Sequence, residues 1–190
     1  RIHKTPQEIQ CLRNACEISC RAFERILEDI RPGVTEKELA ARLSLYMVME
    51  GADTKLYGNI LISGARTSLL HGIPSSKAVE YGDFVLMDFG CQYQGYLSDM
   101  TRTVVVGRAT DKQKEVYALE ERMLEDSLRK MKAGARLKDV YGASIEAIKG
   151  TEYLPYHYSG IGHGIGLFVH EPPFMGPSSE EVLEAGSGRT

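Results

Sequence analysis

Two apolar runs decide the fold class of this sequence: Val85-Leu86-Met87-Asp88-Phe89 and Tyr96-Leu97-Ser98-Asp99-Met100. Short apolar runs bounded by glycine are typical of buried strands. Gln94-Gly95 lies between them and predicts a turn, which would place the two strands side by side. A carboxylate among apolar residues is costly to bury unless it is paired or binds a cation. The pattern therefore predicts that Asp88 and Asp99 face one cavity.

The segments around these strands predict an α+β fold, because helices occur in pairs and strands in blocks. Thr5-Pro6-Gln7-Glu8 and Thr35-Glu36-Lys37-Glu38 both have the capping pattern of a helix start. Four helices are expected. The first runs from after Thr5 to before Pro32, the second from after Thr35 to before Gly51, the third from after Thr110 to before Gly134, and the fourth from about Leu137 to about Ile148. The expected strands are 57–63, 84–89, 93–96 and 101–106, with Gly-rich strand-like segments from 156 to 170.

An internal repeat divides the chain near residue 110. Segment 31–39 resembles segment 132–140, and His71-Gly72-Ile73-Pro74 recurs in pattern as His170-Glu171-Pro172-Pro173. We therefore expect one domain over residues 1–190, built from a first half of about 1–109 and a second half of about 110–190. The second half is expected to be incomplete at its C-terminus, because the hairpin that follows Gly82 has no counterpart after Gly186. Chance similarity of short segments is the alternative.

Composition and charge argue against several classes of protein. The chain has 190 residues, of which 43% are hydrophobic and 26% charged, and its formal net charge is −3. This charge gives no support for nucleic acid or an anionic membrane as a partner, and no apolar run approaches the roughly 20 residues of a membrane span. The first residues lack the apolar stretch of a signal peptide. Four cysteines fit neither a paired zinc motif nor a disulfide framework, so we expect reduced thiols in a cytoplasmic protein.

His163 is a candidate to join the two aspartates at a metal site. It lies within the glycine-rich run 160–166, where backbone or substrate can approach closely. Two carboxylates and one imidazole suit Mn²⁺, Fe²⁺ or Co²⁺ at least as well as Zn²⁺. The alternative for Asp88 and Asp99 is hydrogen bonding to backbone amides or to Arg102, and the alternative for His163 is a histidine in a turn.

His71 and His170 occupy matching places in the repeat, each shortly before a proline. A neutral imidazole can transfer a proton near pH 7 or hold a developing oxyanion. Both are therefore candidates for catalysis and substrate binding. The alternative for each is a satisfied side chain at the end of a strand.

Three motifs resemble the Xaa-Pro dipeptidase and aminopeptidase P family, from about residue 3 to Gly186. They are Met87-Asp88-Phe89-Gly90, the run Tyr93-Gln94-Gly95-Tyr96-Leu97-Ser98-Asp99-Met100-Thr101-Arg102-Thr103, and Gly162-His163-Gly164-Ile165-Gly166-Leu167. The second run is more like the Xaa-Pro branch than the methionine branch. These enzymes share the pita-bread fold, a pseudo-twofold duplication, with methionine aminopeptidases and creatinase, so the resemblance implies that fold here.

The resemblance also implies roles for the candidate residues. Asp88 corresponds to the first metal-binding aspartate, Asp99 to the aspartate that bridges two metals, and His163 to the only histidine ligand. His71 matches a histidine near the leaving group, and His170 one that contacts the scissile carbonyl. In the family, a hydroxide bound by two divalent metals attacks that carbonyl. We expect Mn²⁺, with Co²⁺, Fe²⁺ and Zn²⁺ as alternatives, short peptides as substrates, and a homodimer.

The chain departs from the family pattern in one respect. The family completes its metal site with two glutamates on strands beyond the position of Gly186, and no counterpart is found here; Glu180, Glu181 and Glu184 precede the expected strand. The resemblance thus implies a metal-dependent exopeptidase domain, acting on Xaa-Pro peptides, whose site is incomplete within these residues. A shortened chain, an omitted internal segment and a divergent non-catalytic member are competing explanations. A peptide- or protein-binding module on the same fold and a methionine aminopeptidase are the alternative functions.

Overall fold

The computed structural model describes residues 2–53 and 58–186, and these form two compact units. The N-terminal unit contains Pro6–Ala109 and Gly166–Val169. The C-terminal unit contains the segment up to Thr5, Thr110–Ile165, and the chain from His170 onward. Along the chain, the boundary between the long segments of the two units falls between Ala109 and Thr110.

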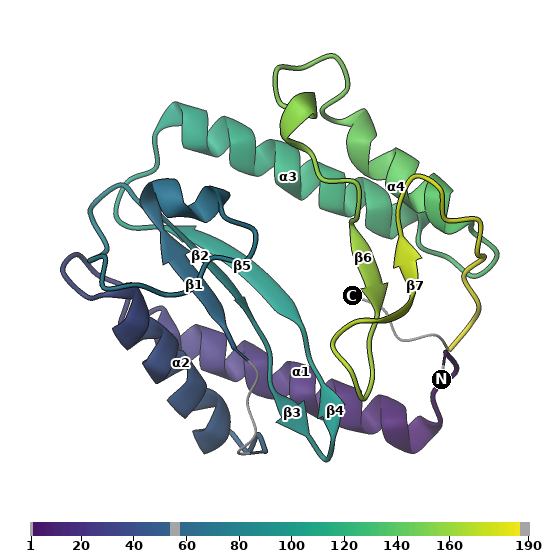
Figure 1. Cartoon of the computed structure of the whole chain (residues 1–190), viewed down its shortest axis with the longest axis horizontal. Helices are drawn as coiled ribbons and strands as arrows, with labels where there is room; N and C mark the ends of the chain where they lie inside the picture. Colours follow the sequence, from purple (N-terminus) through teal and green to yellow (C-terminus); the bar gives the residue numbers. More distant parts are fainter. Residues whose placement is uncertain (1, 54–57, 187–190) are drawn as a thin grey trace. The chain divides into compact units, whose positions relative to one another are not determined.

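The N-terminal unit is a three-stranded antiparallel sheet with two helices (Figure 1). Its sheet order is β1-β2-β5, and a short hairpin, β3–β4, separates β2 from β5 along the chain. Its elements are α1 (Pro6–Ile26), α2 (Glu36–Met49), β1 (Ile60–Ser63), the 3-10 helix η1 (Gly64–Ser68), β2 (Phe84–Phe89), β3 (Gln92–Tyr93), β4 (Tyr96–Leu97) and β5 (Met100–Val105).

Local sequence signals explain where most of these elements begin. Thr35 caps α2 by accepting a hydrogen bond from the Glu38 amide, and the Glu38 carboxylate accepts from the Thr35 amide. The turn expected at Gln94-Gly95 is confirmed, with positive φ angles of 49° and 86° that join β3 to β4. The prediction of a single strand over 93–96 is therefore wrong, because these residues belong to the two strands and the turn of a hairpin. Of the strand expected over 57–63, only Ile60–Ser63 forms, and Tyr57 lies outside the described residues.

The first helix ends earlier than its apolar spacing predicts. It stops at Ile26 instead of continuing to Pro32, and the next residues form turns with tighter hydrogen bonds, such as that from the Asp29 amide to the Ile26 carbonyl. The Asp29 carboxylate accepts hydrogen bonds from Arg42 and Tyr46 of α2. These contacts between helices draw the chain toward α2, and the spacing of apolar residues carries no information about them.

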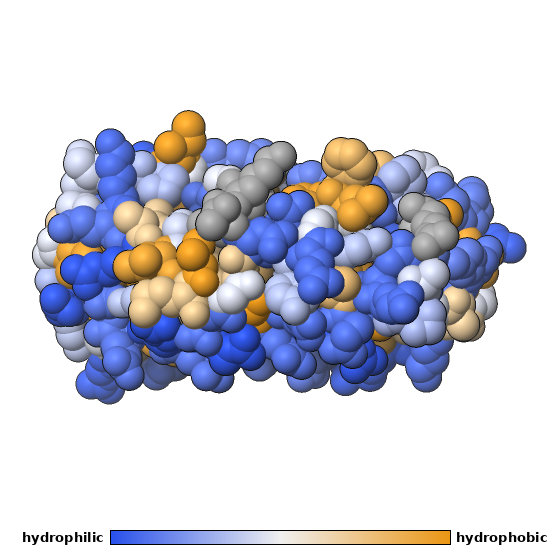
Figure 2. Space-filling model, turned by 90° about the horizontal axis from the view of Figure 1, so that it is seen from below, coloured by the Kyte–Doolittle hydropathy of each residue, from blue (hydrophilic) through white to orange (hydrophobic). Residues whose placement is uncertain are grey.

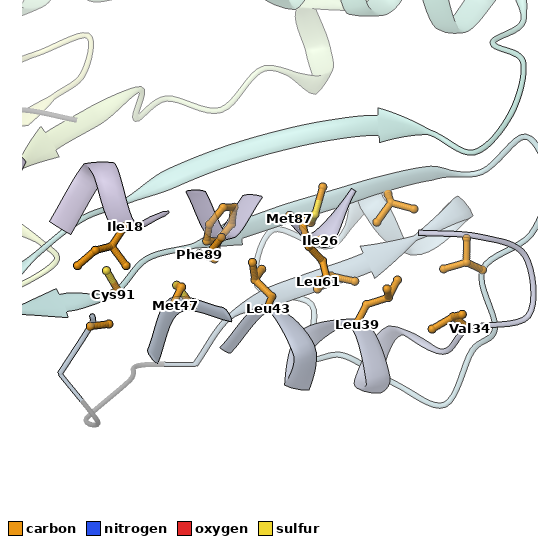
Figure 3. Close-up of a cluster of buried hydrophobic side chains, with 14 of the residues drawn as sticks. Ile18, Ile26, Val34, Leu39, Leu43, Met47, Leu61, Met87, Phe89 and Cys91 are labelled. Atoms are coloured by element: carbon orange, nitrogen blue, oxygen red, sulfur yellow. The ribbon is translucent and has the colours of Figure 1, made fainter. Parts of the chain in front are cut away.

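The core of this unit lies between α1, α2 and one face of the sheet (Figure 3). Val85, Met87 and Phe89 of β2 are buried on that face, and the Phe89 ring stacks on Phe23 with centroids 6.4 Å apart. The intervening residues Leu86 and Asp88 are half-buried, as the alternation of a strand requires. Asp88 therefore points to the face that α1 and α2 do not cover.

The C-terminal unit is a helix pair with a two-stranded sheet. Its elements are α3 (Asp111–Lys130), α4 (Leu137–Glu146), the 3-10 helix η2 (Leu154–Tyr156), β6 (Gly162–Gly164) and β7 (Glu171–Met175). Thr110 and Gln113 form a capping box at the start of α3. Only Gly162–Gly164 of the strand-like segments expected over 156–170 forms a strand, and its partner β7 was not expected, because its two prolines argue against a strand.

The internal repeat is present in the backbone hydrogen bonds of both units. In each, the turn before the shorter helix pairs with the returning chain: Gly33 donates to the Val79 carbonyl at 2.9 Å, and Gly134 donates to the Leu183 carbonyl at 2.8 Å. Three further backbone pairings match between the halves. In the first half they are Thr35–Ala78, Val34–Val79 and Glu36–Lys77. Their counterparts in the second half are Arg136–Val182, Ala135–Leu183 and Leu137–Glu181. The resemblance between segments 31–39 and 132–140 is therefore structural.

No helix in the described part of the chain is long and apolar enough to cross a bilayer. The face shown in Figure 2 is mainly hydrophilic, with hydrophobic residues in small separate groups. Scattered apolar residues of this kind are normal on a protein surface.

Candidate metal centre

Asp88 and Asp99 lie at the same end of the sheet of the N-terminal unit. Asp88 is opposite Ile60 of β1 and Thr101 of β5. Asp99 directly precedes β5, two positions before Thr101. The hairpin β3–β4 returns the chain over eight residues, from Cys91 to Ser98, so that the second carboxylate comes back beside the strand that carries the first.

Arg102, the alternative partner for these carboxylates, is not the residue of β5 that lies opposite Asp88. It is opposite Met87, one position away from the Asp88 pair, and its guanidinium donates to the carbonyl of Thr101 at 2.7 Å. Because neighbouring positions of a strand point to opposite faces, the register directs Arg102 away from the face of Asp88.

His163 and His170 lie together in the C-terminal unit. Their ring centroids are 4.4 Å apart, with the planes inclined at 62°. The Nδ1 atom of His163 is 3.0 Å from the carbonyl oxygen of Gly164. Since a carbonyl can only accept, this contact requires a proton on Nδ1, and a neutral imidazole then has its lone pair on Nε2. An imidazole oriented in this way is suited to bind a cation through Nε2.

Glycine at position 164 is required by the close approach of β7. A Cβ atom there would lie 2.6 Å from the carbonyl oxygen of Pro172 and 2.8 Å from that of Glu171. Both contacts are with backbone atoms, which cannot swing away, and β6 carries His163 next to this position.

We expect Gly164→Ala to lower the free energy of unfolding by about 1–3 kcal/mol, as overpacking does. Gly142→Ala is the matched control, because Gly142 lies inside α4 with nothing within 4 Å of the added Cβ, and alanine there is expected to stabilise. Urea unfolding of both variants measures the difference. Equal stabilities would show that β7 can withdraw without cost.

Residues 10–188 match the profile of a protein family described as Metallopeptidase family M24. The chain belongs to metallopeptidase family M24. It is 38% identical over 186 residues to an Xaa-Pro dipeptidase of Pyrococcus furiosus and 33% identical over 205 residues to the Xaa-Pro aminopeptidase of Escherichia coli. These alignments cover 98% of this chain but only 53% and 46% of the relatives, so the chain spans about half of their length.

Solved structures of M24 relatives agree closely with the fold. The X-Pro aminopeptidase of Thermotoga maritima superposes with a TM-score of 0.95 at 38% identity, and the prolidase of P. furiosus with a TM-score of 0.94 at 38% identity. Each covers 98% of this chain, and the chain covers 53% and 56% of them. The α+β, pita-bread fold and the resemblance to Xaa-Pro peptidases are therefore confirmed. M24 enzymes use divalent metal ions.

The M24 candidates divide between the two units. Asp88, Asp99 and His71 belong to the N-terminal unit, and His163 and His170 belong to the C-terminal unit. Within either unit, the described residues contain no group of three or more His, Cys, Asp or Glu side chains arranged to hold a metal ion. Taken by residue type, carboxylates such as Asp88 and Asp99 and a neutral imidazole such as His163 are donors that divalent ions accept. The site assignments stay predictions.

A buried ion pair beside His170 was not predicted from the sequence. Lys4 donates to the carboxylate of the next residue, Glu171, at 2.9 Å, and the two side chains are only 4% and 13% exposed. The pair ties the start of the chain to β7. No sequence signal marks it, because the partners are 167 residues apart.

A second missed group anchors the segment that carries His71. The fully buried Glu36 carboxylate accepts hydrogen bonds from the amides of Ser63 and Ser75, at 2.7 and 2.9 Å, and from Arg66 at 3.1 Å. Arg66 also donates to the Ile73 carbonyl at 2.7 Å. Burial alone would raise the pKa of Glu36, but the hydrogen bonds from Ser75 and Ser63 outweigh it, so the pKa is lowered. The exposed His71 side chain thus lies on a firmly held loop.

Proposed function

We propose that this chain forms part of the catalytic domain of a two-metal exopeptidase that removes the N-terminal residue of Xaa-Pro peptides. The observation that carries the proposal is the return of the chain through β3–β4, which brings Asp99 to the sheet end that carries Asp88. Similarity to enzymes named Xaa-Pro dipeptidase and Xaa-Pro aminopeptidase supports the substrate class. The ions are Mn²⁺, the substrates are short peptides, and the protein acts in the cytoplasm as a homodimer.

Three side chains would hold the ions. Asp88 and Asp99 supply oxygen ligands, and His163 supplies Nε2 while its Nδ1 keeps a proton shared with the Gly164 carbonyl. When bound, two divalent ions lower the pKa of water and so supply the nucleophile at neutral pH. In the family that the chain resembles, two glutamates complete the metal site.

The remaining histidines would act on the peptide. His170 lies against the His163 ring, so that an N–H of His170 can donate to the scissile carbonyl oxygen as charge develops on it. His71 would contact the substrate near the leaving group, from the loop that Glu36 and Arg66 anchor. Both assignments follow the family resemblance and the matching places of the two residues in the repeat.

Metal uptake and cleavage together test the proposal. The 190-residue chain and the longest product of the same reading frame would be dialysed against Mn²⁺, analysed for bound metal, and assayed with Xaa-Pro and Met-Ala peptides. We expect about two ions and Xaa-Pro cleavage in the product that contains all ligands. Cleavage of Met-Ala peptides alone would favour a methionine aminopeptidase. Absence of both metal and cleavage in every product would favour a binding module.

A further inference from the structure

A buried serine in α1 is bonded to a different element instead of its own helix. Ser19 is fully buried between Ala15 and Ala22 of the core. A hydroxyl in such surroundings is costly unless it is hydrogen-bonded. The Ser19 hydroxyl lies 2.7 Å from the hydroxyl of Ser98 and 3.6 Å from the sulfur of Cys91.

Two other buried helix serines behave differently. Ser127 of α3 donates to the Met123 carbonyl at 2.9 Å, and Ser144 of α4 donates to the Tyr141 carbonyl at 2.7 Å. Each of these hydroxyls is satisfied within its own helix, as is usual for a serine in a helix interior. The hydroxyl of Ser19 therefore links α1 to the segment that precedes Asp99.

Ser98 and Cys91 close the base of the hairpin β3–β4. The Ser98 amide donates to the Cys91 carbonyl at 2.9 Å, and the Cys91 amide donates to the Ser98 hydroxyl at 3.0 Å. The Cys91 thiol also donates to the Ala15 carbonyl of α1 at 3.3 Å. Both ends of the hairpin are thus tied to each other and to α1.

This anchor fixes the chain on one side of Asp99, and the sheet fixes it on the other. Ser98 is the residue immediately before Asp99, and Met100, immediately after, pairs with Phe89 in the β2–β5 ladder. The backbone position of Asp99 relative to Asp88 therefore depends on the Ser98 anchor as well as on the ladder.

We infer that Ser19, acting through Ser98, is a positioning residue that holds the Asp99 carboxylate in place for a divalent metal ion. The inference rests on the proposed function. A metal ligand must be held close to its productive geometry by the groups behind it, and loss of such a group typically weakens metal binding by about 10–100-fold.

Two matched substitutions test this role in the longest product of the reading frame. Ser19→Ala and Ser127→Ala each remove one buried helix hydroxyl, but only the first removes a link to the hairpin. We expect Ser19→Ala to raise the dissociation constant for Mn²⁺ about tenfold, and Ser127→Ala to change it less than about twofold. We also expect the amides of Cys91 and Ser98 to exchange with solvent faster in Ser19→Ala, while its urea midpoint stays close to that of Ser127→Ala.

A third variant gives a second measurement of Mn²⁺ binding that does not depend on the folding of Ser19→Ala. Cys91→Ala removes the other link to α1 but keeps the Ser19–Ser98 bond, so it should weaken Mn²⁺ binding less than Ser19→Ala. An unchanged dissociation constant in Ser19→Ala, an equal rise in Ser127→Ala, or unchanged exchange at Cys91 and Ser98 would overturn the role of Ser19. A wild-type protein that takes up no divalent ion would instead overturn the proposed function.

Discussion

Asp99→Asn is expected to abolish high-affinity Mn²⁺ binding and, with it, peptide cleavage. The substitution keeps the shape of the side chain but removes the charge that would bridge two ions. Since loss of a group behind a ligand already costs about 10–100-fold in affinity, loss of the ligand itself should cost at least about 100-fold. Isothermal titration with Mn²⁺ and an Xaa-Pro cleavage assay on the longest product of the reading frame measure both effects.

The stability of the metal-free protein separates a ligand from a structural carboxylate. A ligand near Asp88 repels it when no cation is present, so we expect Asp99→Asn to leave the free energy of unfolding within about 1 kcal/mol of wild type or to raise it. A carboxylate that served only the fold would lose hydrogen bonds worth about 1–3 kcal/mol. Asp111→Asn is the control, because Asp111 is exposed on α3, where it pairs with nearby Lys114. Undiminished Mn²⁺ binding by Asp99→Asn would refute its role.

Sequence predicted those features whose signals are local. The capping boxes at Thr35 and Thr110 set the starts of α2 and α3, because their hydrogen bonds span only three residues. The turn at Gln94-Gly95 was predicted for the same reason. The repeat was also legible, because the turns at Gly33 and Gly134 need matching backbone conformations, with φ angles of 93° and 90°.

The errors concern features that depend on contacts between distant residues. The end of α1 is set by Asp29 and its partners on α2, and β7 forms despite its two prolines because it pairs with β6. The motifs named Asp88, Asp99 and His163, but they did not show the anchor of Ser19 on Ser98, since the two are 79 residues apart. Motifs thus name candidate site residues, and the fold shows which other residues hold them.

Glu36 is the clearest case of a role that local sequence conceals. In the sequence it is simply a residue of the capping box at Thr35, and its counterpart in the repeat is Leu137, which is equally buried. In the structure it accepts hydrogen bonds from Ser63, Ser75 and Arg66. The first half of the repeat thus joins its shorter helix to the neighbouring loops through the buried carboxylate of Glu36, and the second half does so through apolar packing of Leu137.

We expect Glu36→Ala to lower the free energy of unfolding by about 3–5 kcal/mol, because it leaves Arg66 and several buried donors without their acceptor. Glu38→Ala is the matched control in the same helical turn. It removes the exposed capping contact with Thr35, which stabilises the fold less than a buried hydrogen-bond network does. Urea unfolding at pH 7 measures both variants. A loss in Glu36→Ala no greater than that in Glu38→Ala would show that the buried network is dispensable.

A comparison of wild type with Glu36→Ala at different pH values gives a further test, because the lowered pKa of Glu36 fixes the direction of the expected change in stability. A carboxyl whose pKa is lower in the folded than in the unfolded state stabilises fully above its unfolded pKa of about 4.3. That stabilisation is lost as the pH falls through the folded pKa. The stability difference between wild type and Glu36→Ala should therefore be constant from pH 7 to about 5 and shrink below about 4. A difference that stayed constant into acid would mean that Glu36 stabilises the fold by packing and not by its charge.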